Sequence, residues 1–293
     1  MTWERVLVYN ALAFALQMPL GVALDVSNPA LVRCGFFLGT GTVAAAAFSM
    51  WMGLGGWGLL CVACMGNALF HLTAGKRLLE AHDGRSGPAG LFISTGALGL
   101  LAGRMGMEKA AAICVPVFAV ALAACLAACR AAWMADVAAK HGRDARPQSS
   151  LRRDAAGGAG DFAAASVGVL VSLGLFALIV WRSWAALESM RLSVEAGLAF
   201  ILCGVFVTWA GKAAGGYLAE WLGRWLVTAV SVCGSLALAF ACSPESPTAW
   251  MFLLFTAQLA TGPVLSLVYD RTRRLGGGTA FGVNCLGLFA GSL

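Results

Sequence analysis

Seven polar side chains lie inside stretches of the sequence that are otherwise apolar. They are Gln17, Asn67, His71, Lys212, Gln258, Thr261 and Asn284. Their amide, hydroxyl and amine groups can hydrogen-bond a polar solute, and histidine, which titrates near neutral pH, could also carry a proton. Asn67 and His71 are four residues apart and would share one helix face, as would Gln258 and Thr261 at a spacing of three. Packing is the alternative role for His71, and for Lys212 the alternative is a side chain that reaches out to water.

Two acidic residues end apolar stretches in similar surroundings. GVALD ends on Asp25 and GYLAE ends on Glu220, inside the stretch GGYLAEWLGR at 215–224. An acid at the carboxyl end of a helix is disfavoured by the helix dipole and needs a partner. Arg224 could pair with Glu220 around a turn, and the nearest base after Asp25 is Arg33. The amino terminus of a neighbouring helix is a second kind of partner, because its free N–H groups attract anions.

The composition excludes a water-soluble globular protein. Of the 293 residues, 60 % are hydrophobic and 12 % are charged, and the mean hydropathy is +0.81. Soluble domains are usually about 25 % charged, so this chain has too few charges to cover a surface that faces water. Its apolar runs are about 20 residues long, enough for a helix to cross about 30 Å of hydrocarbon. We therefore expect an all-α polytopic membrane protein in a lipid bilayer.

The chain divides into ten apolar segments and one polar linker. The segments are 5–24, 30–53, 56–75, 87–106, 110–134, 163–185, 194–217, 225–242, 249–269 and 277–293. The linker, 135–162, is basic and rich in Gly, Pro and Ser, as is typical of a flexible connection. It separates a bundle of five segments (1–134) from a second bundle of five (163–293).

The distribution of Lys and Arg predicts the orientation. One set of alternating loops holds twelve: Lys76, Arg77, Arg85, Lys140, Arg143, Arg146, Arg152, Arg153, Arg224, Arg271, Arg273 and Arg274. The opposite set holds four: Arg104, Lys109, Arg182 and Arg191. Cytoplasmic loops carry the excess of Lys and Arg. We therefore expect a multi-pass protein of the cell membrane whose linker, 135–162, faces the cytoplasm.

Two short motifs recur in the same order. GVALD is followed by GALGLLAG, and GYLAE is followed by NCLGLFAG, which matches GALGLLAG at five of eight positions. The distance from Asp25 to Leu98 is 73 residues, and from Glu220 to Leu286 it is 66. The second copy of each motif lies six segments after the first. Because an even shift keeps the orientation, the repeat is parallel and its unit has six helices. Two such units need twelve helices, so we expect the first helix of the first unit and the last of the second to be missing.

GGYLAEWLGRW, with the six-helix repeat and the basic linker, resembles the major facilitator superfamily of transporters. The family's signature after its second and eighth helices is G-x-L-[AS]-D-R-x-G-R-[RK]. The match is carried by Gly216, Leu218, Ala219, Glu220 in place of Asp, Gly223 and Arg224. Trp221 and Trp225 lie where the family has basic residues, and the copy that ends on Asp25 keeps Gly21 but lacks the Gly-Arg pair.

The resemblance implies a gate. In the family this motif ties the two halves together when the transporter faces outward. Asp25 would then lie against the start of the last segment, near 277–279, and Glu220 against the start of the fourth, near 87–90. We expect these ties to break as the halves rock against each other. Helix-end charges that only anchor the protein at the membrane surface are the alternative interpretation.

The resemblance also implies a function. Ten helices in two pseudo-symmetric bundles would enclose a cavity, lined by the seven polar residues named first. We expect a secondary active transporter that moves a small solute by alternating access, with proton coupling left open and a monomer as the expected state. The alternative is a membrane protein of the same fold that does not transport, such as a partner subunit or a sensor.

Other functions lack support in the sequence. Cys61 and Cys64 have the spacing of a redox or zinc pair, but two small apolar residues on one helix face explain it better, since no second pair lies at ligand spacing. No Ser-His or Cys-His pairing and no phosphate-binding loop indicates an enzyme. We therefore expect neither catalysis nor a metal or cofactor. The net charge of +6 is concentrated in the loops and requires no nucleic acid partner.

Overall fold

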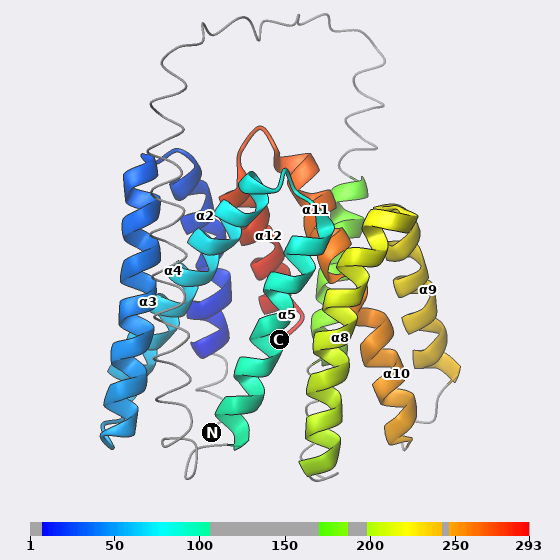
Figure 1. Cartoon of the computed structure of the whole chain (residues 1–293), viewed down its shortest axis with the longest axis horizontal. Coiled ribbons are helices and arrows are strands. Elements are labelled where there is room, and N and C mark those ends of the chain that lie inside the picture. The colour runs from blue at the N-terminus through cyan, green and yellow to red at the C-terminus, as the bar shows by residue number, and fades with distance from the viewer. Residues whose placement is uncertain (1–7, 106–169, 187–197, 242–245, 293) are drawn as a thin grey trace, which may run out of the picture. The chain divides into compact units, whose positions relative to one another are not determined.

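The structure is a computed structural model that describes residues 8–105, 170–186, 198–241 and 246–292 (Figure 1). Every secondary-structure element in these ranges is a helix. Within the described residues, six helical segments are long and apolar enough to cross a membrane, and two more are apolar but shorter. This confirms the prediction of an all-helical chain with several helices suited to a membrane. The predicted segment 110–134 and the linker 135–162 lie outside the described residues, so the ten-helix arrangement stays a prediction.

The first half of the described chain contains five helices. They are η1 (Ala11–Ala15), α2 (Gln17–Asp25), α3 (Pro29–Trp51), α4 (Trp57–Ala81) and α5 (Ser86–Met105). η1 is a π-helical turn, in which the Leu16 N–H donates to the Ala11 carbonyl at 3.3 Å. It precedes Pro19, which lacks a backbone donor, so the first predicted span is irregular at its centre. α4 continues past its predicted end and carries Lys76 and Glu80 on its last turns.

The second half contains six helices. They are Leu170–Ala186, α8 (Leu198–Leu222), α9 (Arg224–Ala241), α10 (Pro247–Gln258), α11 (Thr261–Thr272) and α12 (Gly277–Ala290). The predicted segment 249–269 lies within the apolar stretch Pro247–Thr272, which is long enough to cross a membrane, but it is not one regular helix. A break at Leu259 and Ala260 separates α10 from α11. Pro263 explains the break, because it has no N–H for the Leu259 carbonyl and its ring crowds that group.

Glycines allow the two halves to approach closely at two places. At the first, α2 lies against α12, and a Cβ atom on Gly21 would be 2.2 Å from the carbonyl oxygen of Gly278. At the second, α8 lies against α5, and a Cβ atom on Gly216 would be 2.5 Å from the carbonyl oxygen of Ser86. Only glycine fits at these distances. The glycine that begins each copy of the motif is therefore required by helix packing.

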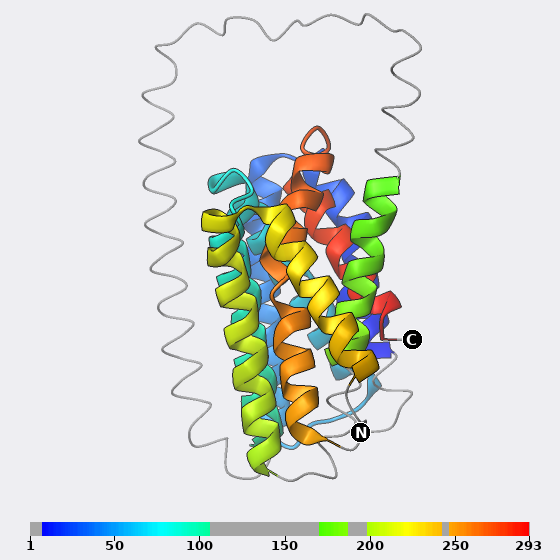
Figure 2. The ribbon, with the colours of Figure 1, turned by 90° about the vertical axis from the view of Figure 1, so that its right-hand side faces the viewer.

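The largest buried cluster lies where α2, α4, α11 and α12 meet. It includes Leu24, Leu72, Val264, Leu265 and Phe281. α11 is buried along most of its length, as expected of a helix at the centre of a bundle. α8, α9 and α10 pack against one another beside it (Figure 2).

Candidate functional site

Several loops and helix ends gather at one end of the helices, the upper end in Figure 1. We call it the basic end, because it carries Lys76, Arg85, Arg224, Arg271, Arg273 and Arg274. Five acids of the described residues also lie there, each in an ion pair: Asp25, Glu80, Asp83, Glu220 and Asp270. These are all the acids of the described part of the chain. The ion pairs of the described residues are therefore concentrated at the basic end.

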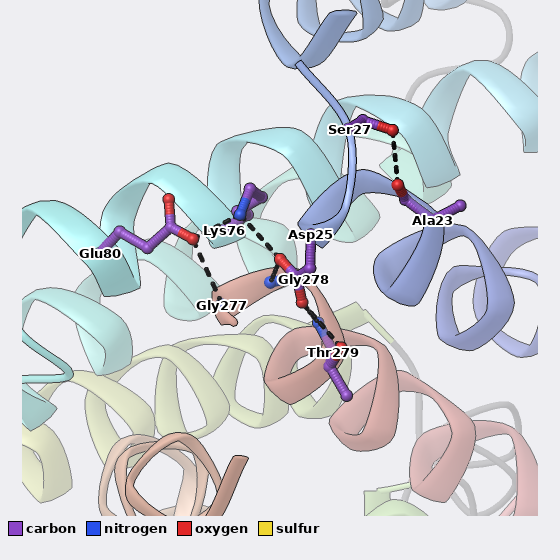
Figure 3. Close-up of polar contacts among 8 residues, drawn as sticks. All are labelled: Ala23, Asp25, Ser27, Lys76, Glu80, Gly277, Gly278 and Thr279. Carbon is purple, nitrogen blue, oxygen red and sulfur yellow. Dashed lines mark hydrogen bonds and ion pairs between the residues drawn. The ribbon is translucent and has the colours of Figure 1, made fainter. Parts of the chain in front are cut away.

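Asp25 binds the amino terminus of α12 (Figure 3). Its Oδ1 accepts from the Gly278 N–H at 2.9 Å, and its Oδ2 accepts from the N–H and hydroxyl of Thr279 at 2.6 and 2.7 Å. The side chain is only 2 % exposed. Helix termini leave N–H groups without partners and carry partial positive charge, so the carboxylate satisfies both needs. α12 thus obtains its capping group from the opposite half of the chain.

Lys76 completes this contact from α4 (Figure 3). Its Nζ donates to Asp25 Oδ1 at 2.7 Å and also pairs with Glu80 one turn further on. Glu80 in turn accepts from the Gly277 N–H at 3.4 Å. Three helices, α2, α4 and α12, are thereby joined by one hydrogen-bonded network. The charge of Asp25 is neutralised both by a cation and by a helix terminus.

Glu220 makes the corresponding contact at the end of α8. Its Oε1 accepts from the Gly87 N–H at 3.0 Å, at the start of α5, and its Oε2 accepts from Arg85 at 2.6 Å. The pair is more open to solvent, since the Arg85 side chain is 62 % exposed and that of Glu220 is 18 % exposed. An open hollow of about 440 Å³ adjoins it, lined by Arg85, Ser86, Ala219, Glu220, Gly223 and Arg224. This contact should therefore be weaker than that of Asp25.

Two predicted ion-pair partners differ from those in the structure. Glu220 pairs with Arg85, whereas Arg224 donates to Asp270 at 2.5 Å. Gly223, with φ of +96°, ends α8 between them, so Glu220 and Arg224 are not on one continuous helix. Likewise, the base bonded to Asp25 is Lys76. The predicted base, Arg33, lies in the first turns of α3.

Each of the two acids contacts a helix from the opposite half of the chain. Asp25 from the first half binds α12 in the second, and Glu220 from the second half binds α5 in the first. These are the contacts that the sequence predicted near 277–279 and 87–90. A hydrogen bond of 2.9 Å between the Ser86 and Ser266 hydroxyls also joins the halves. The halves are therefore tied together at the basic end, while the gating role of these ties stays a prediction.

Glu220→Gln is expected to shift the balance between closed and open conformations by only about 1.4- to fivefold, because an exposed ion pair contributes about 0.2–1 kcal/mol. The glutamine keeps an acceptor for the Gly87 N–H but loses the charge that Arg85 neutralises. Crosslinking of the two halves at the basic end measures this balance. Asp270→Asn is the control, since its pair with Arg224 lies within the second half and does not join the halves. An unchanged balance in Glu220→Gln would count against a gate at this position.

Four of the seven predicted cavity residues are fully buried and lie in a polar cluster. These are Gln17, Gln258, Thr261 and Asn284. Gln17 accepts from the Cys285 thiol at 3.1 Å, and Gln258 accepts from the Thr261 hydroxyl at 3.2 Å, beside the break between α10 and α11. Asn284 accepts from Arg182 at 3.0 Å. The structure thus brings polar side chains from α2, α10, α11 and α12 into the interior.

The other three predicted cavity residues have different surroundings. The Asn67 amide donates to the Tyr9 hydroxyl at 3.5 Å. His71 is half-buried and packs edge-on against Phe92, with ring centres 6.0 Å apart. Lys212, also half-buried, interacts electrostatically with His71. His71 and Lys212 come from opposite halves, so this pair also lies where the halves meet.

Arg182 is the interior residue that the sequence analysis missed. It was counted among the bases of the outer loops, but it lies inside the helix Leu170–Ala186 and is only 3 % exposed. Its position within the predicted segment 163–185 was the available signal. A base inside an apolar segment belongs with the intramembrane polar residues. Without Arg182, one set of loops holds twelve Lys and Arg residues and the opposite set holds three, so the predicted orientation is unchanged.

The chain matches no protein-family model, and no curated protein matches it. Its function is therefore argued from the contacts at the basic end, the polar cluster in the interior and the resemblance of the GGYLAEWLGR motif.

Proposed function

We propose that this protein is a secondary transporter that moves a small solute across the cell membrane by alternating access, as members of the major facilitator superfamily do. The observation that supports the proposal is the pair of reciprocal contacts between the two halves at the basic end. In each, an acid that ends one helix caps the start of a helix from the opposite half. A protein that only needed anchors at the membrane surface would have no reason to pair them across the halves.

These contacts suit a gate because they are strong but reversible. Hydrogen bonds to a charged group contribute about 1.5–3 kcal/mol each, and none of them is covalent. When the halves separate at this end, water can hydrate both the carboxylate and the freed N–H groups. In the proposal the basic end faces the cytoplasm, as the excess of Lys and Arg indicates. The structure would then correspond to a state closed on the cytoplasmic side.

Two irregular helices support a solute site in the interior. The π-turn η1 immediately precedes Gln17, and the break at Leu259 and Ala260 lies between Gln258 and Thr261. Interrupted helices inside membranes are tolerated where the freed backbone groups meet polar partners or line a cavity. Both interruptions occur beside polar side chains of the interior cluster. Their position is the one expected for residues that contact a solute.

The proposal is tested by counterflow in proteoliposomes that contain the purified full chain. The labelled probes are inorganic phosphate, succinate, alanine, glucose and tetraethylammonium. We expect at least one probe to accumulate faster than in liposomes without protein, and its unlabelled form to compete. Uptake equal to that of empty liposomes for every probe, by protein that is folded, would favour the non-transporting alternative.

A further inference from the structure

The interior of the structure contains a positive charge that no described acid neutralises. Arg182 is 3 % exposed, and all five acids of the described residues are engaged in ion pairs at the basic end. Burying an unpaired charge is costly, so such groups normally pair with an opposite charge. In the described part of the chain, the Nη1 atom of Arg182 is buried and has no hydrogen-bond partner.

The rest of the Arg182 side chain is held in place. Its Nη2 donates to Asn284 Oδ1 at 3.0 Å, which fixes one arm of the guanidinium group. Its backbone carbonyl accepts from the Gln258 amide at 3.5 Å. Because one arm is fixed and the other has no partner, the free N–H groups of Nη1 have a defined direction. A guanidinium group of this kind matches two oxygens of a carboxylate or phosphate.

Other basic groups lie close by. Lys212 on α8 interacts electrostatically with Arg182 and with His71 on α4. The positive charges of Arg182 and Lys212 repel each other, and a bound anion would relieve this repulsion. A cationic solute would instead add a further positive charge.

We propose that Arg182 anchors an oxyanion, so that the solute of this protein is a small anion with a carboxylate or phosphate group. This inference rests on the proposed transport function and specifies the chemical class of its solute. Arg182 binds the oxyanion head directly, Asn284 orients the guanidinium group, and Lys212 supplies a second positive charge. Gln258, which donates to the Arg182 backbone carbonyl, and Thr261, which donates to Gln258, are neutral polar groups of the same hydrogen-bonded cluster.

Thermal unfolding of the full chain, followed by tryptophan fluorescence, tests the site. The probes are sodium phosphate, sodium succinate and sodium lactate, with sodium chloride at equal ionic strength and tetraethylammonium chloride as references. We expect at least one oxyanion to raise the Tm in a saturable way, because a ligand that binds only the folded state stabilises it. No saturable rise with any oxyanion, or a rise with tetraethylammonium alone, would overturn the inference.

Arg182→Met is expected to abolish that rise while the Tm without ligand is unchanged or higher. Replacing an unpaired buried charge with an apolar chain of similar length removes a desolvation cost. Arg182→Lys, which keeps the charge but not the planar fork, should retain part of the rise. Arg273→Met, at the exposed pair with Asp83, is the matched control and should retain all of it. A sharply lower Tm of Arg182→Met without ligand, or an oxyanion response that survives in it, would contradict the inference.

The two proposals can fail separately. Saturable binding of an oxyanion through Arg182 without counterflow of any probe would refute transport and leave the anion site standing. Counterflow of glucose or tetraethylammonium, with no oxyanion response, would refute the anion site and leave transport standing.

Discussion

Asp25→Asn is expected to open the basic end and to lower the rate of counterflow at least about tenfold in a chain that still folds. The Asp25 carboxylate accepts four hydrogen bonds, from Lys76, Gly278 and Thr279, and is 2 % exposed. Asparagine has one acceptor oxygen, and its NH₂ group would face N–H donors. The charge that neutralises Lys76 is lost as well. Removing one partner of a buried ion pair costs about 3–5 kcal/mol, and 1.4 kcal/mol is about a factor of ten.

Initial rates of counterflow measure this effect, and thermal unfolding shows that the variant is folded. Asp270→Asn is the matched control. It removes the same charge, but Asp270 pairs with Arg224 inside the second half and is 43 % exposed. Its rate should stay within about twofold of the original, since an exposed pair contributes little. Equal rates for the two variants would show that the contact between Asp25 and α12 has no special role.

Gly215→Val is expected to destabilise the fold by at least about 3 kcal/mol, because overpacking against a rigid neighbour commonly costs 1–3 kcal/mol or more. A Cβ atom on Gly215 would lie 1.9 Å from the carbonyl oxygen of Leu259 and 2.6 Å from its Cα. These are backbone atoms at the break between α10 and α11, so no side-chain rotation relieves the clash. α8 would have to move away from the break, together with Gly216 and Glu220, which follow on the same helix.

The melting temperature of the purified variant measures this cost, and we expect a fall of about 5–10 °C. Gly41→Val is the control, because a Cβ atom on Gly41 in α3 has nothing within 4 Å. The same added volume should there change the melting temperature by only a degree or two, because it meets no neighbour and glycine and valine differ little in helix propensity. If Gly215→Val and Gly41→Val have the same melting temperature, α8 does not pack against the break.

The contacts of the two acids were predicted from the resemblance, which implied the helix starts near 277–279 and 87–90. The residues alone indicated only that an acid at a helix end needs a helix amino terminus or a base as its partner. The choice of base was beyond the sequence. Lys76 reaches Asp25 only because α4 continues past its apolar run, and Arg85 reaches Glu220 from a loop 135 residues earlier. Such partners are set by tertiary packing.

Two features of the interior have clear signals in the sequence. Pro263 lies inside an apolar segment, where proline breaks a helix unless it lies in the first turn. Arg182 lies inside another such segment and marks a polar interior as clearly as the amides do. By contrast, the network that joins Gln17 to Cys285 and Arg182 to Asn284 spans helices far apart in the sequence. No spacing rule within one helix predicts it.

Distances between spin labels across the two ends of the bundle test the central claim most directly. Labels carried by non-natural amino acids avoid the ten native cysteines. One pair replaces Val26 and Leu275 at the basic end, and the other replaces Leu54 and Phe240 at the opposite end; all four side chains are more than 60 % exposed. We predict that Asp25→Asn lengthens the first distance and shortens the second, as reciprocal opening and closing requires. Unchanged distances at both ends in folded Asp25→Asn protein would contradict a gate held by Asp25.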